Sequence, residues 1–479
     1  MDQWHGRLFS GGWIEARGGR IEVREPATGA RLAEVGQADA DDVRAAAAAA
    51  HAAQPAWAAF SPSDKAAILR RAADYLESQA ALVAEWIVRE TGAVAGKAAV
   101  ELKLATGVLH RAAAMALEPR GLILPSETGT TSLARRVPHG VVGIISPFNF
   151  PLILSARALA PALAAGNAVV LKPDPRTPVT GGLLLARAFE EAGLPDGLLH
   201  VLPGGAEAGE ALVADPDVAM ISFTGSTAAG RRVAALAAQS LKKVSLELGG
   251  KNALIVLDDA DLDLAVSNTA WGAFLHQGQI CMATGRVLVP EHLAEDFAAR
   301  LAERAERLPV GDPHREEVAL GPLIDTRQAA RAITIVEASI AAGARLRAGG
   351  TADGVFMRPT VLDRVAPDMP AFEQEIFGPV APITAYRDED EAARLANRTD
   401  YGLSAGIVTG SVARGLDFAA RLDTGIVHIN DQTVADEPWA PFGGTGASGG
   451  GRHGGPANWE EFTRWQWLTM KAAPPAYPF

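Results

Sequence analysis

From about residue 137 the chain alternates short apolar runs with segments of helical pattern. Three of the runs are strand candidates, at residues 141–145, 168–171 and 218–223. This alternation predicts an α/β protein whose strands form a parallel sheet. Each run ends in polar or glycine-bearing residues, and ligands bind outside the carboxyl ends of the strands in such sheets. We therefore expect the loops at 146–149, 172–174 and 224–226 to meet at one crevice.

A second unit of the same type follows the first. It begins with the apolar run 252–257 and continues to about Phe442. A chain of 479 residues with 48% hydrophobic content exceeds what one core usually supports, so two or more domains are expected. No long linker separates the units, so we predict a tight boundary near Gly249 and Gly250.

Two N-terminal segments have helical patterns. Between Ser63 and Gly92, apolar residues recur at helical spacing with charged residues opposite them. Ser63 is the predicted N-cap of this helix, and Gly92 its predicted end. The alanine run at 45–50 follows three aspartates. Because acidic residues stabilise a helix N-terminus, a second helix is expected there.

Charge and hydropathy exclude several classes of function. The 44 basic against 56 acidic residues give a net charge of −12, which disfavours nucleic acid and anionic membranes as partners. The longest apolar region, 152–171, is interrupted by Arg157, Pro161 and Gly166, so it predicts a helix and a strand rather than a membrane span. The first residues lack the pattern of a signal peptide. We therefore expect a cytoplasmic protein.

Cys281 is the only cysteine of the chain. It cannot form an internal disulfide, and one reduced thiol agrees with a cytoplasmic location. The residue lies between a glycine-bearing polar turn and the apolar run 287–289, so we expect it on a loop that leads into a strand. Taken alone, this pattern favours a small buried hydrophobic residue over a reactive thiol.

Seven short motifs change that interpretation, because they occur in the order found in the aldehyde dehydrogenase superfamily. The chain resembles this superfamily from about residue 26 to residue 469, through PFNFP at 147–151, KP at 172–173, FTGS at 223–226, ELGGK at 247–251, GQIC at 278–281, EIFGP at 375–379 and PFGG at 441–444. The resemblance implies two Rossmann-like parallel-sheet domains and a β oligomerisation arm. It assigns residues 1–118 and 139–249 to dinucleotide binding, 250–442 to a catalytic domain, and 119–138 with 455–479 to the arm and C-terminal strand.

The resemblance also implies three catalytic roles. Cys281 matches the family's nucleophile, whose thiolate adds to an aldehyde carbonyl to give a thiohemiacetal. The Asn149 side-chain amide, with the backbone N–H of Cys281, would stabilise the oxygen that becomes negative. Glu247 matches the general base that activates water to hydrolyse the thioester. Because members that transfer the acyl group to coenzyme A generally lack this glutamate, a free carboxylic acid is the expected product.

The cofactor implied by the resemblance is NAD, with NADP as the alternative. No Gly-x-Gly-x-x-Gly fingerprint follows a strand, so the site is expected to be the superfamily's own variant. Ser226 is expected to cap a helix whose N-terminus receives the pyrophosphate, while Lys172 and Glu375 would hold the two riboses. No metal ion is expected. The residues expected to contact the cofactor are Ser146, Pro147, Phe148, Lys172, Gly225, Ser226, Glu375 and Phe377.

Two positions depart from the family's pattern. Three residues after the lysine, where a glutamate often favours NAD, this chain has Pro175, followed by Arg176. The choice between NAD and NADP is therefore left open. His453 stands where many members have a glutamate proposed to act as a base or proton relay. A histidine is able to relay protons near neutral pH, but in this glycine-rich loop we expect His453 to lie on the surface.

Within the superfamily the resemblance is closest to the benzaldehyde dehydrogenases, on the stretches 172–178, 276–282 and 430–433. It implies that a small aromatic aldehyde is oxidised to its acid, with Phe150 and Phe442 as walls of an apolar slot. The alternative among enzymes is an aliphatic aldehyde dehydrogenase. The alternative outside enzymes is a catalytically silent binding or structural protein on the same scaffold. Without the resemblance, both phenylalanines would be interpreted as core residues.

The C-terminal segment is rich in aromatic residues. Trp465, Trp467 and Thr469 alternate as in a strand, and residues 122–136 are expected to form an extended arm. Aromatic surface on a terminal segment indicates docking against a neighbouring subunit. We therefore expect a homodimer or homotetramer.

Overall fold

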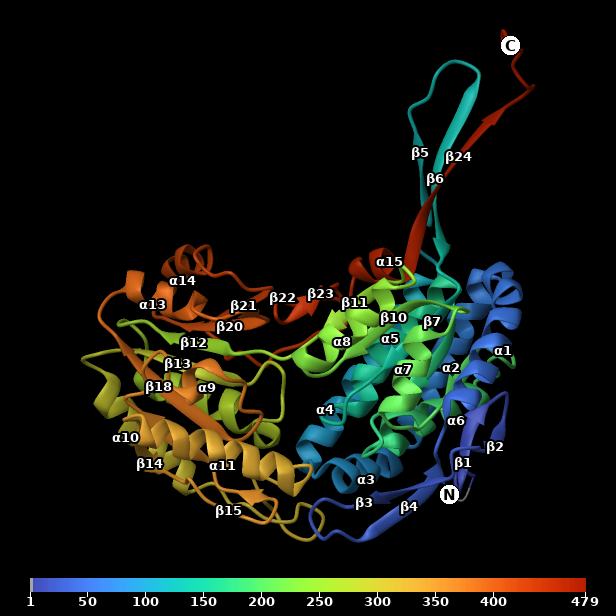
Figure 1. Ribbon diagram of the computed structural model, residues 1–479. Coiled ribbons are helices and arrows are strands. Elements are labelled where there is room, and N and C mark those ends of the chain that lie inside the picture. Colours follow the sequence, from blue (N-terminus) through green and yellow to red (C-terminus); the bar gives the residue numbers. More distant parts are fainter. Residues whose placement is uncertain (1–2) are drawn as a thin grey trace.

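The computed structural model describes residues 3–479, which form two lobes and a projecting arm (Figure 1). One lobe contains an eight-stranded sheet, the other a seven-stranded sheet, and the arm is a three-stranded sheet. This architecture confirms the predicted α/β fold with two parallel-sheet units and a β arm. No helix within residues 3–479 combines the length and the apolar character needed to cross a membrane.

The first lobe contains the sheet predicted from residue 137 onward. Its strand order is β2-β1-β9-β8-β7-β10-β11-β23, and the five strands from β9 to β11 are parallel. Every residue of β7 and β8 is buried, as is typical of parallel strands covered on both faces. β7, β8 and β10 confirm the three predicted strands. The strands are β1 (Arg7–Ser10), β2 (Trp13–Glu15), β7 (Val141–Ile145), β8 (Ala168–Lys172), β9 (Leu199–Val201), β10 (Val218–Thr224), β11 (Lys243–Glu247) and β23 (Gly449–Gly450).

Helices pack around this sheet (Figure 1). The helix predicted at the alanine run is α1, and Asp39 caps it in a capping box with Asp42, so the acidic residues satisfy its first backbone N–H groups. The helices of this lobe are α1 (Ala40–Ala59), α2 (Pro62–Ser78), α3 (Ala80–Thr91), α4 (Ala95–Met115), α5 (Pro151–Ala165), the π-helix η1 (Val179–Leu183), α6 (Leu184–Glu191), α7 (Ala206–Ala214) and α8 (Thr227–Ala238).

The helix predicted between Ser63 and Gly92 is two helices, α2 and α3. The chain leaves the helical conformation at Gln79, where φ is −103° and ψ is 20°. The N-cap is Ser61 rather than Ser63, because Pro62 occupies the first helical position, where its missing N–H is not needed. The predicted end is correct: Gly92 adopts the left-handed conformation with φ of 72°.

The second lobe begins at β12, directly after Gly249 and Gly250. Its strand order is β14-β17-β18-β13-β12-β20-β21, and only the β14–β17 pair is antiparallel. The strands are β12 (Asn252–Val256), β13 (Thr284–Pro290), β14 (Arg345–Ala348), β17 (Thr360–Asp363), β18 (Val380–Tyr386), β20 (Ser404–Val408) and β21 (Ile426–Ile429). The helices are α9 (Leu262–Phe274), the 3-10 helix η2 (Leu275–Gly278), α10 (Ala294–Glu306), α11 (Thr326–Ala341), α12 (Pro370–Glu373), α13 (Glu389–Asn397) and α14 (Val412–Ala419).

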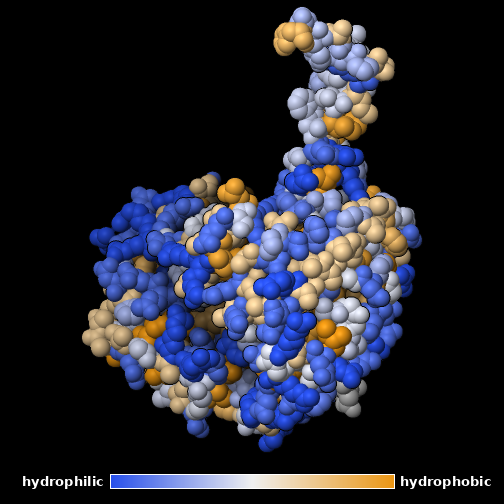
Figure 2. Space-filling view, turned by 45° about the vertical axis from the view of Figure 1, so that its right-hand side comes forward, coloured by the Kyte–Doolittle hydropathy of each residue, from blue (hydrophilic) through white to orange (hydrophobic). Residues whose placement is uncertain are grey.

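The arm rises from the body beside α15 (Ala457–Phe462) in Figure 1, and Figure 2 shows it projecting from the surface. It consists of β5 (Gly121–Leu124), β6 (Thr130–Pro138) and β24 (Thr463–Lys471), in the antiparallel order β24-β6-β5. The predicted C-terminal strand is therefore present. Ile123 and Trp467 on the arm are 85% and 73% exposed. Three two-stranded pairs complete the fold: β3 (Arg20–Arg24) with β4 (Arg31–Gly36), β15 (Ala352–Asp353) with β16 (Phe356–Met357), and β19 (Tyr401–Gly402) with β22 (Thr445–Gly446).

Candidate active site

Asn149, Glu247 and Cys281 line one cavity of about 1030 Å³ between the two lobes, where the surface is hollowed in Figure 2. Asn149 follows β7, Glu247 is the last residue of β11, and Cys281 precedes β13. The carboxyl ends of parallel strands meet at one edge of a sheet, which brings Asn149 and Glu247 together. Cys281 comes from the second lobe, where it lies at the amino end of β13 and faces that edge across the cavity. All of the residues expected to contact the cofactor line the same cavity: Ser146, Pro147, Phe148, Lys172, Gly225, Ser226, Glu375 and Phe377.

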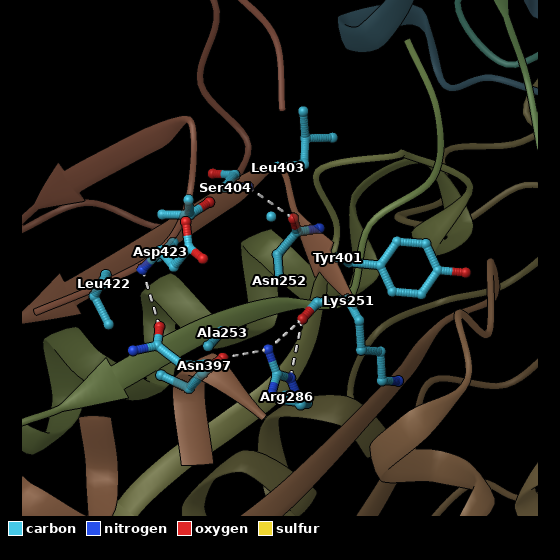
Figure 3. Close-up of a pocket in the computed structure, with 14 residues that line it drawn as sticks. Lys251, Asn252, Ala253, Arg286, Asn397, Tyr401, Leu403, Ser404, Leu422 and Asp423 are labelled. Atoms are coloured by element: carbon cyan, nitrogen blue, oxygen red, sulfur yellow. Dashed lines mark hydrogen bonds between the residues drawn. The ribbon is translucent and has the colours of Figure 1, made fainter. Parts of the chain in front are cut away.

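The loop that carries Cys281 is held by the first residue of β12. The Asn252 side chain donates hydrogen bonds to the carbonyls of Cys281 and Ala283, at 2.8 and 2.9 Å. Its Oδ1 accepts from the Ser404 N–H at 3.0 Å, as Figure 3 shows. A Cβ atom at Gly250 would lie 2.5 Å from the Cys281 carbonyl, so only glycine allows the chain to approach this loop so closely.

A separate cavity of about 290 Å³ lies next to this loop within the second lobe (Figure 3). Arg286, which is buried beside it, donates to the carbonyls of Lys251 and Ala396. Neither Cys281 nor Glu247 lines this cavity. Its polar side chains therefore tie β12, β13 and α13 together rather than contribute to the site between the lobes.

Asn149 is 3% exposed, and its side chain points toward the Cys281 loop. The Asn149 Nδ2 group donates to the Gln279 carbonyl at 2.8 Å. The amide is thereby directed at the backbone two residues before the thiol. A side-chain N–H in this position is available to a negative oxygen that forms on an adduct of Cys281.

Glu247 is buried, and neither of its carboxylate oxygens has a hydrogen-bond partner in residues 3–479. Burial raises the pKa of Glu247 to about 8, while the positive charges of Arg157 and Arg452 act in the opposite direction. Carboxyl groups with pKa values near the working pH are suited to general acid and base catalysis. Because its side chain is buried, Glu247 is not an ordinary surface carboxylate.

The surroundings of Cys281 disfavour its thiolate. Burial and the carboxylates of Glu247 and Glu375 raise the pKa of Cys281 to about 12, and the positive charge of Arg157 opposes them. Because the thiolate is the nucleophilic form, reaction at Cys281 requires that a base remove its proton.

Arg157 is a charged residue of this region that the sequence reasoning did not assign to the site. It lies on α5, is 6% exposed, and forms an ion pair with Asp436. Burial lowers the pKa of Arg157 to about 10, and the charges of Glu247 and Cys281 counteract that effect. A signal was present: Arg157 is the single charged residue between Pro151 and Leu171, and charged residues are rarely buried unless they are paired.

A larger cavity of about 1550 Å³ adjoins the first, between α7 and α8. The two cavities share Ile145, Lys172, Phe223, Ser226 and Ala229 as lining residues. Together they form a groove that leads from Cys281 to the space between these helices. At the junction, the Ser226 side chain accepts from the Ala229 N–H at 3.3 Å and caps α8, which confirms the predicted cap.

Comparison with known proteins agrees with this geometry. A family model described as the aldehyde dehydrogenase family matches residues 13–468. The chain belongs to the aldehyde dehydrogenase family. It is 56% identical to a vanillin dehydrogenase of Amycolatopsis sp., over 100% of this chain and 99% of that protein. It is 53% identical to benzaldehyde dehydrogenase [NAD(+)] of Pseudomonas putida, over 99% of this chain and 98% of that protein.

A solved structure extends the agreement to three dimensions. The crystal structure of a salicylaldehyde dehydrogenase from Pseudomonas putida G7, complexed with salicylaldehyde, matches with a TM-score of 0.96 and 38% identity. It covers 99% of each chain. The arrangement of both lobes and the arm is thus that of an aldehyde dehydrogenase.

The residues of this aldehyde dehydrogenase fit a dinucleotide in the groove. A Cβ atom at Gly249 would lie 2.3 Å from the Glu375 carboxylate, and one at Gly225 would lie 2.7 Å from the Phe223 ring. Because neither glycine has a side chain, Glu375 and Phe223 are able to keep their positions along the groove. The Lys172 ammonium donates to the carbonyls of Pro173 and Gly204, and the residue lines both cavities at their junction.

Arg176, which follows the departure at Pro175, is held by other side chains. Its guanidinium donates two bonds to Asp174, contacts Asp325 at 3.1 Å, and lies 4.1 Å from the centre of the Phe148 ring. Asp325 caps α11 of the second lobe. Arg176 therefore links the two lobes.

At His453, the second position that departs from the family's pattern, the structure contradicts the prediction. His453 was expected on the surface, but it is 2% exposed. Its backbone pairs with that of Phe442 in both directions, and its ring stacks on Phe462 and contacts Ser245 Oγ at 3.2 Å. Burial, with nearby positive charges, lowers the pKa of His453 to about 3. The histidine is therefore neutral at physiological pH.

The two predicted substrate residues lie outside this groove. Neither Phe150 nor Phe442 lines the 1030 Å³ cavity. Both belong to an apolar cluster with Ile280, Met282 and Leu403, which Cys281 also contacts. The thiol therefore lies between a mixed polar groove and an apolar cluster.

Proposed function

We propose that this aldehyde dehydrogenase oxidises an aromatic aldehyde to its carboxylic acid, with NAD as the oxidant. The observation that carries the proposal is the convergence of Cys281, Glu247 and Asn149 on one cavity, next to a groove that fits a dinucleotide. The overall reaction consumes the aldehyde, NAD⁺ and water, and yields the acid, NADH and a proton.

The proposed chemistry assigns one role to each of the three residues. The Cys281 thiolate adds to the carbonyl carbon, and the Asn149 amide with the Cys281 N–H stabilises the oxyanion of the thiohemiacetal. NAD would supply the hydride acceptor when bound, and loss of hydride from the thiohemiacetal would leave a thioester on Cys281. Glu247 then removes a proton from the water that attacks the thioester, so that the acid leaves and the thiol is restored.

We assign Lys172 to the adenine ribose, Glu375 to the nicotinamide ribose, and the N-terminus of α8 at Ser226 to the pyrophosphate. The preference for NAD over NADP is supported by the contacts of Arg176, whose positive charge is paired with the carboxylates of Asp174 and Asp325 rather than left free for a 2′-phosphate. One similar protein bears NAD(+) in its name. The first lobe is accordingly proposed as the dinucleotide-binding domain and the second as the catalytic domain.

The aromatic substrate class is supported by the apolar cluster that includes Phe150 and Phe442. This cluster also contacts Cys281, and apolar surroundings of this kind suit an aromatic ring. The similar proteins are named for vanillin, benzaldehyde and salicylaldehyde. An aliphatic aldehyde dehydrogenase and a catalytically silent protein are the competing hypotheses.

A homodimer or homotetramer is proposed from the arm. Its exposed apolar side chains include Leu122, Ile123, Trp467 and Met470, and exposed apolar patches on a projecting sheet indicate an interface. A second copy of the chain would cover them. The cytoplasmic location stays a prediction from the sequence.

The test is a steady-state comparison of benzaldehyde, vanillin and hexanal, each with NAD and with NADP. We expect the highest kcat/KM with an aromatic aldehyde and NAD. A preference for hexanal would overturn the substrate class, a preference for NADP would overturn the cofactor assignment, and no turnover of any aldehyde would favour a silent protein.

A further inference from the structure

Helix α4 carries a buried ion pair directly beneath the loop of Asn149. Lys97 and Glu101 lie one turn apart, are 4% and 0% exposed, and are hydrogen-bonded to each other. Lys97 was not among the residues singled out from the sequence. The pair faces the 149–153 segment, which contains Asn149 and the start of α5.

The Lys97 ammonium contacts two neighbouring residues of this segment. It donates to the Asn149 carbonyl at 2.8 Å and lies 4.1 Å from the centre of the Phe150 ring. A lysine has three N–H donors. The carboxylate of Glu101 and the carbonyl of Asn149 accept two of them, and the face of the Phe150 ring provides a cation–π contact for the ammonium.

Glu101 holds the other end of the same segment. Its Oε1 accepts from the backbone N–H groups of Leu152 at 2.9 Å and Ile153 at 3.4 Å. The first N–H groups of a helix lack partners within the helix, and the N-cap of α5, Phe150, has no side chain able to accept from them. A carboxylate from another helix therefore caps α5.

Stability alone does not account for this arrangement. The cost of removing two charges from water often equals or exceeds the attraction between them, and apolar residues of similar volume frequently serve as well. In this chain both charges are instead directed at the backbone of one short segment. The cation fixes its start and the anion fixes its end.

We propose that Lys97, together with Glu101, is a positioning residue for Asn149. The pair holds the Asn149 backbone so that its Nδ2 group stays aimed at the Cys281 loop, where it donates to the Gln279 carbonyl. This inference rests on the proposed oxyanion role of Asn149. Because a displacement of about 1 Å at a reacting centre costs about 10²-fold in rate, loss of the pair lowers turnover without touching the substrate.

The test is a double-mutant cycle with Lys97→Met, Asn149→Ala and the double variant, measured by the rate of NADH formation in the first turnover. Lys97→Met is expected to slow this step by about 10- to 100-fold, with the KM for NAD changed less than twofold. Asn149→Ala alone is expected to cost about 10²- to 10³-fold. If Lys97 acts through Asn149, the double variant is no slower than Asn149→Ala.

Lys65 offers a matched control. It is also fully buried, donates to the Ala58 carbonyl at 3.1 Å, and lies 5.3 Å from the centre of the Trp57 ring, but it does not line the site. Lys65→Met is expected to lower the melting temperature and leave the first-turnover rate within about twofold of the parent, since additive effects are expected for distant sites.

The outcomes separate this inference from the proposed function. Multiplicative losses in the double variant, or an unchanged rate in Lys97→Met, overturn the positioning role. A normal rate in Asn149→Ala overturns the oxyanion role itself. If Lys97→Met does not fold, Glu101→Gln replaces it in the cycle. The glutamine amide removes the charge but keeps an oxygen that accepts from the Leu152 N–H. The positioning role is then tested by comparing the double variant of Glu101→Gln and Asn149→Ala with Asn149→Ala alone.

Discussion

The guanidinium of Arg157 lies 4.5 Å from the centre of the Phe442 ring, on the apolar side of the site. From there it acts on both reactive groups, because its charge lowers the pKa of Glu247 and that of Cys281. Burial raises both pKa values, so the arginine partly offsets the cost of ionising a carboxylate and a thiolate away from water. Its own partner, Asp436, keeps the arginine in place.

Replacing Arg157 is therefore expected to move the pH dependence of the reaction. In Arg157→Met the ionised forms of Glu247 and Cys281 lose a favourable charge, so the rising limb of the pH profile of kcat/KM shifts to higher pH, and activity at neutral pH falls by about tenfold or more. Arg157→Lys retains the charge and is expected to give a smaller shift. A profile unchanged in both variants would contradict the electrostatic role.

Thioester hydrolysis is expected to accelerate as the pH rises through about 8, the pKa of Glu247. The sign follows from burial: a raised pKa keeps the carboxyl protonated at lower pH, and only the ionised form accepts a proton from water.

Stopped-flow measurement of NADH in Glu247→Gln should show a burst of one turnover followed by slow release. An unaltered steady-state rate in this variant would remove Glu247 from the role of base.

Cys281→Ala is expected to abolish aldehyde-dependent NADH formation, because no other thiol exists in the chain. Cofactor binding should persist, since Lys172, Ser226 and Glu375 are unaffected. A fluorescence titration with NADH measures that binding and serves as the control for folding. Full dehydrogenase activity in the variant is incompatible with the proposed nucleophile.

Charges on the arm are expected to weaken the assembly. Ile123→Asp combined with Trp467→Asp places two carboxylates on exposed apolar positions of β5 and β24, where a partner subunit would have to bury them. Light scattering coupled to size exclusion should report a smaller species. Leu241→Asp, at a 92% exposed leucine of the body, is the matched control and should keep the parent mass.

Local sequence patterns predicted the central strands of the first sheet. The runs that became β7, β8 and β10 are apolar at consecutive positions and end in turn residues, and such local signals do not depend on distant contacts. The predicted N-cap at Ser63 was wrong by two residues, because Pro62 is tolerated inside the first turn. The break at Gln79 was missed, since apolar spacing continues across it and only packing separates α2 from α3.

The positions of individual side chains required the tertiary structure. His453 was expected to be exposed from its glycine-rich surroundings, yet the Phe442 backbone and the Phe462 ring bury it. The sequence left the role of Arg176 open, and only the structure shows that Asp325, 149 residues away in the chain, binds its guanidinium.

By itself the sequence determined the α/β class, the order of the strands and loops, the single thiol, and the motifs that contain Cys281, Glu247 and Asn149, which line one cavity between the lobes. The tertiary structure decided which charges are buried beside them. The positions of Arg157 over Phe442 and of Lys97 beneath Asn149 depend on helices packing against loops far away in the chain. Because pKa values respond to desolvation and to charges within a few ångströms, the chemistry of these groups becomes visible only in the folded protein.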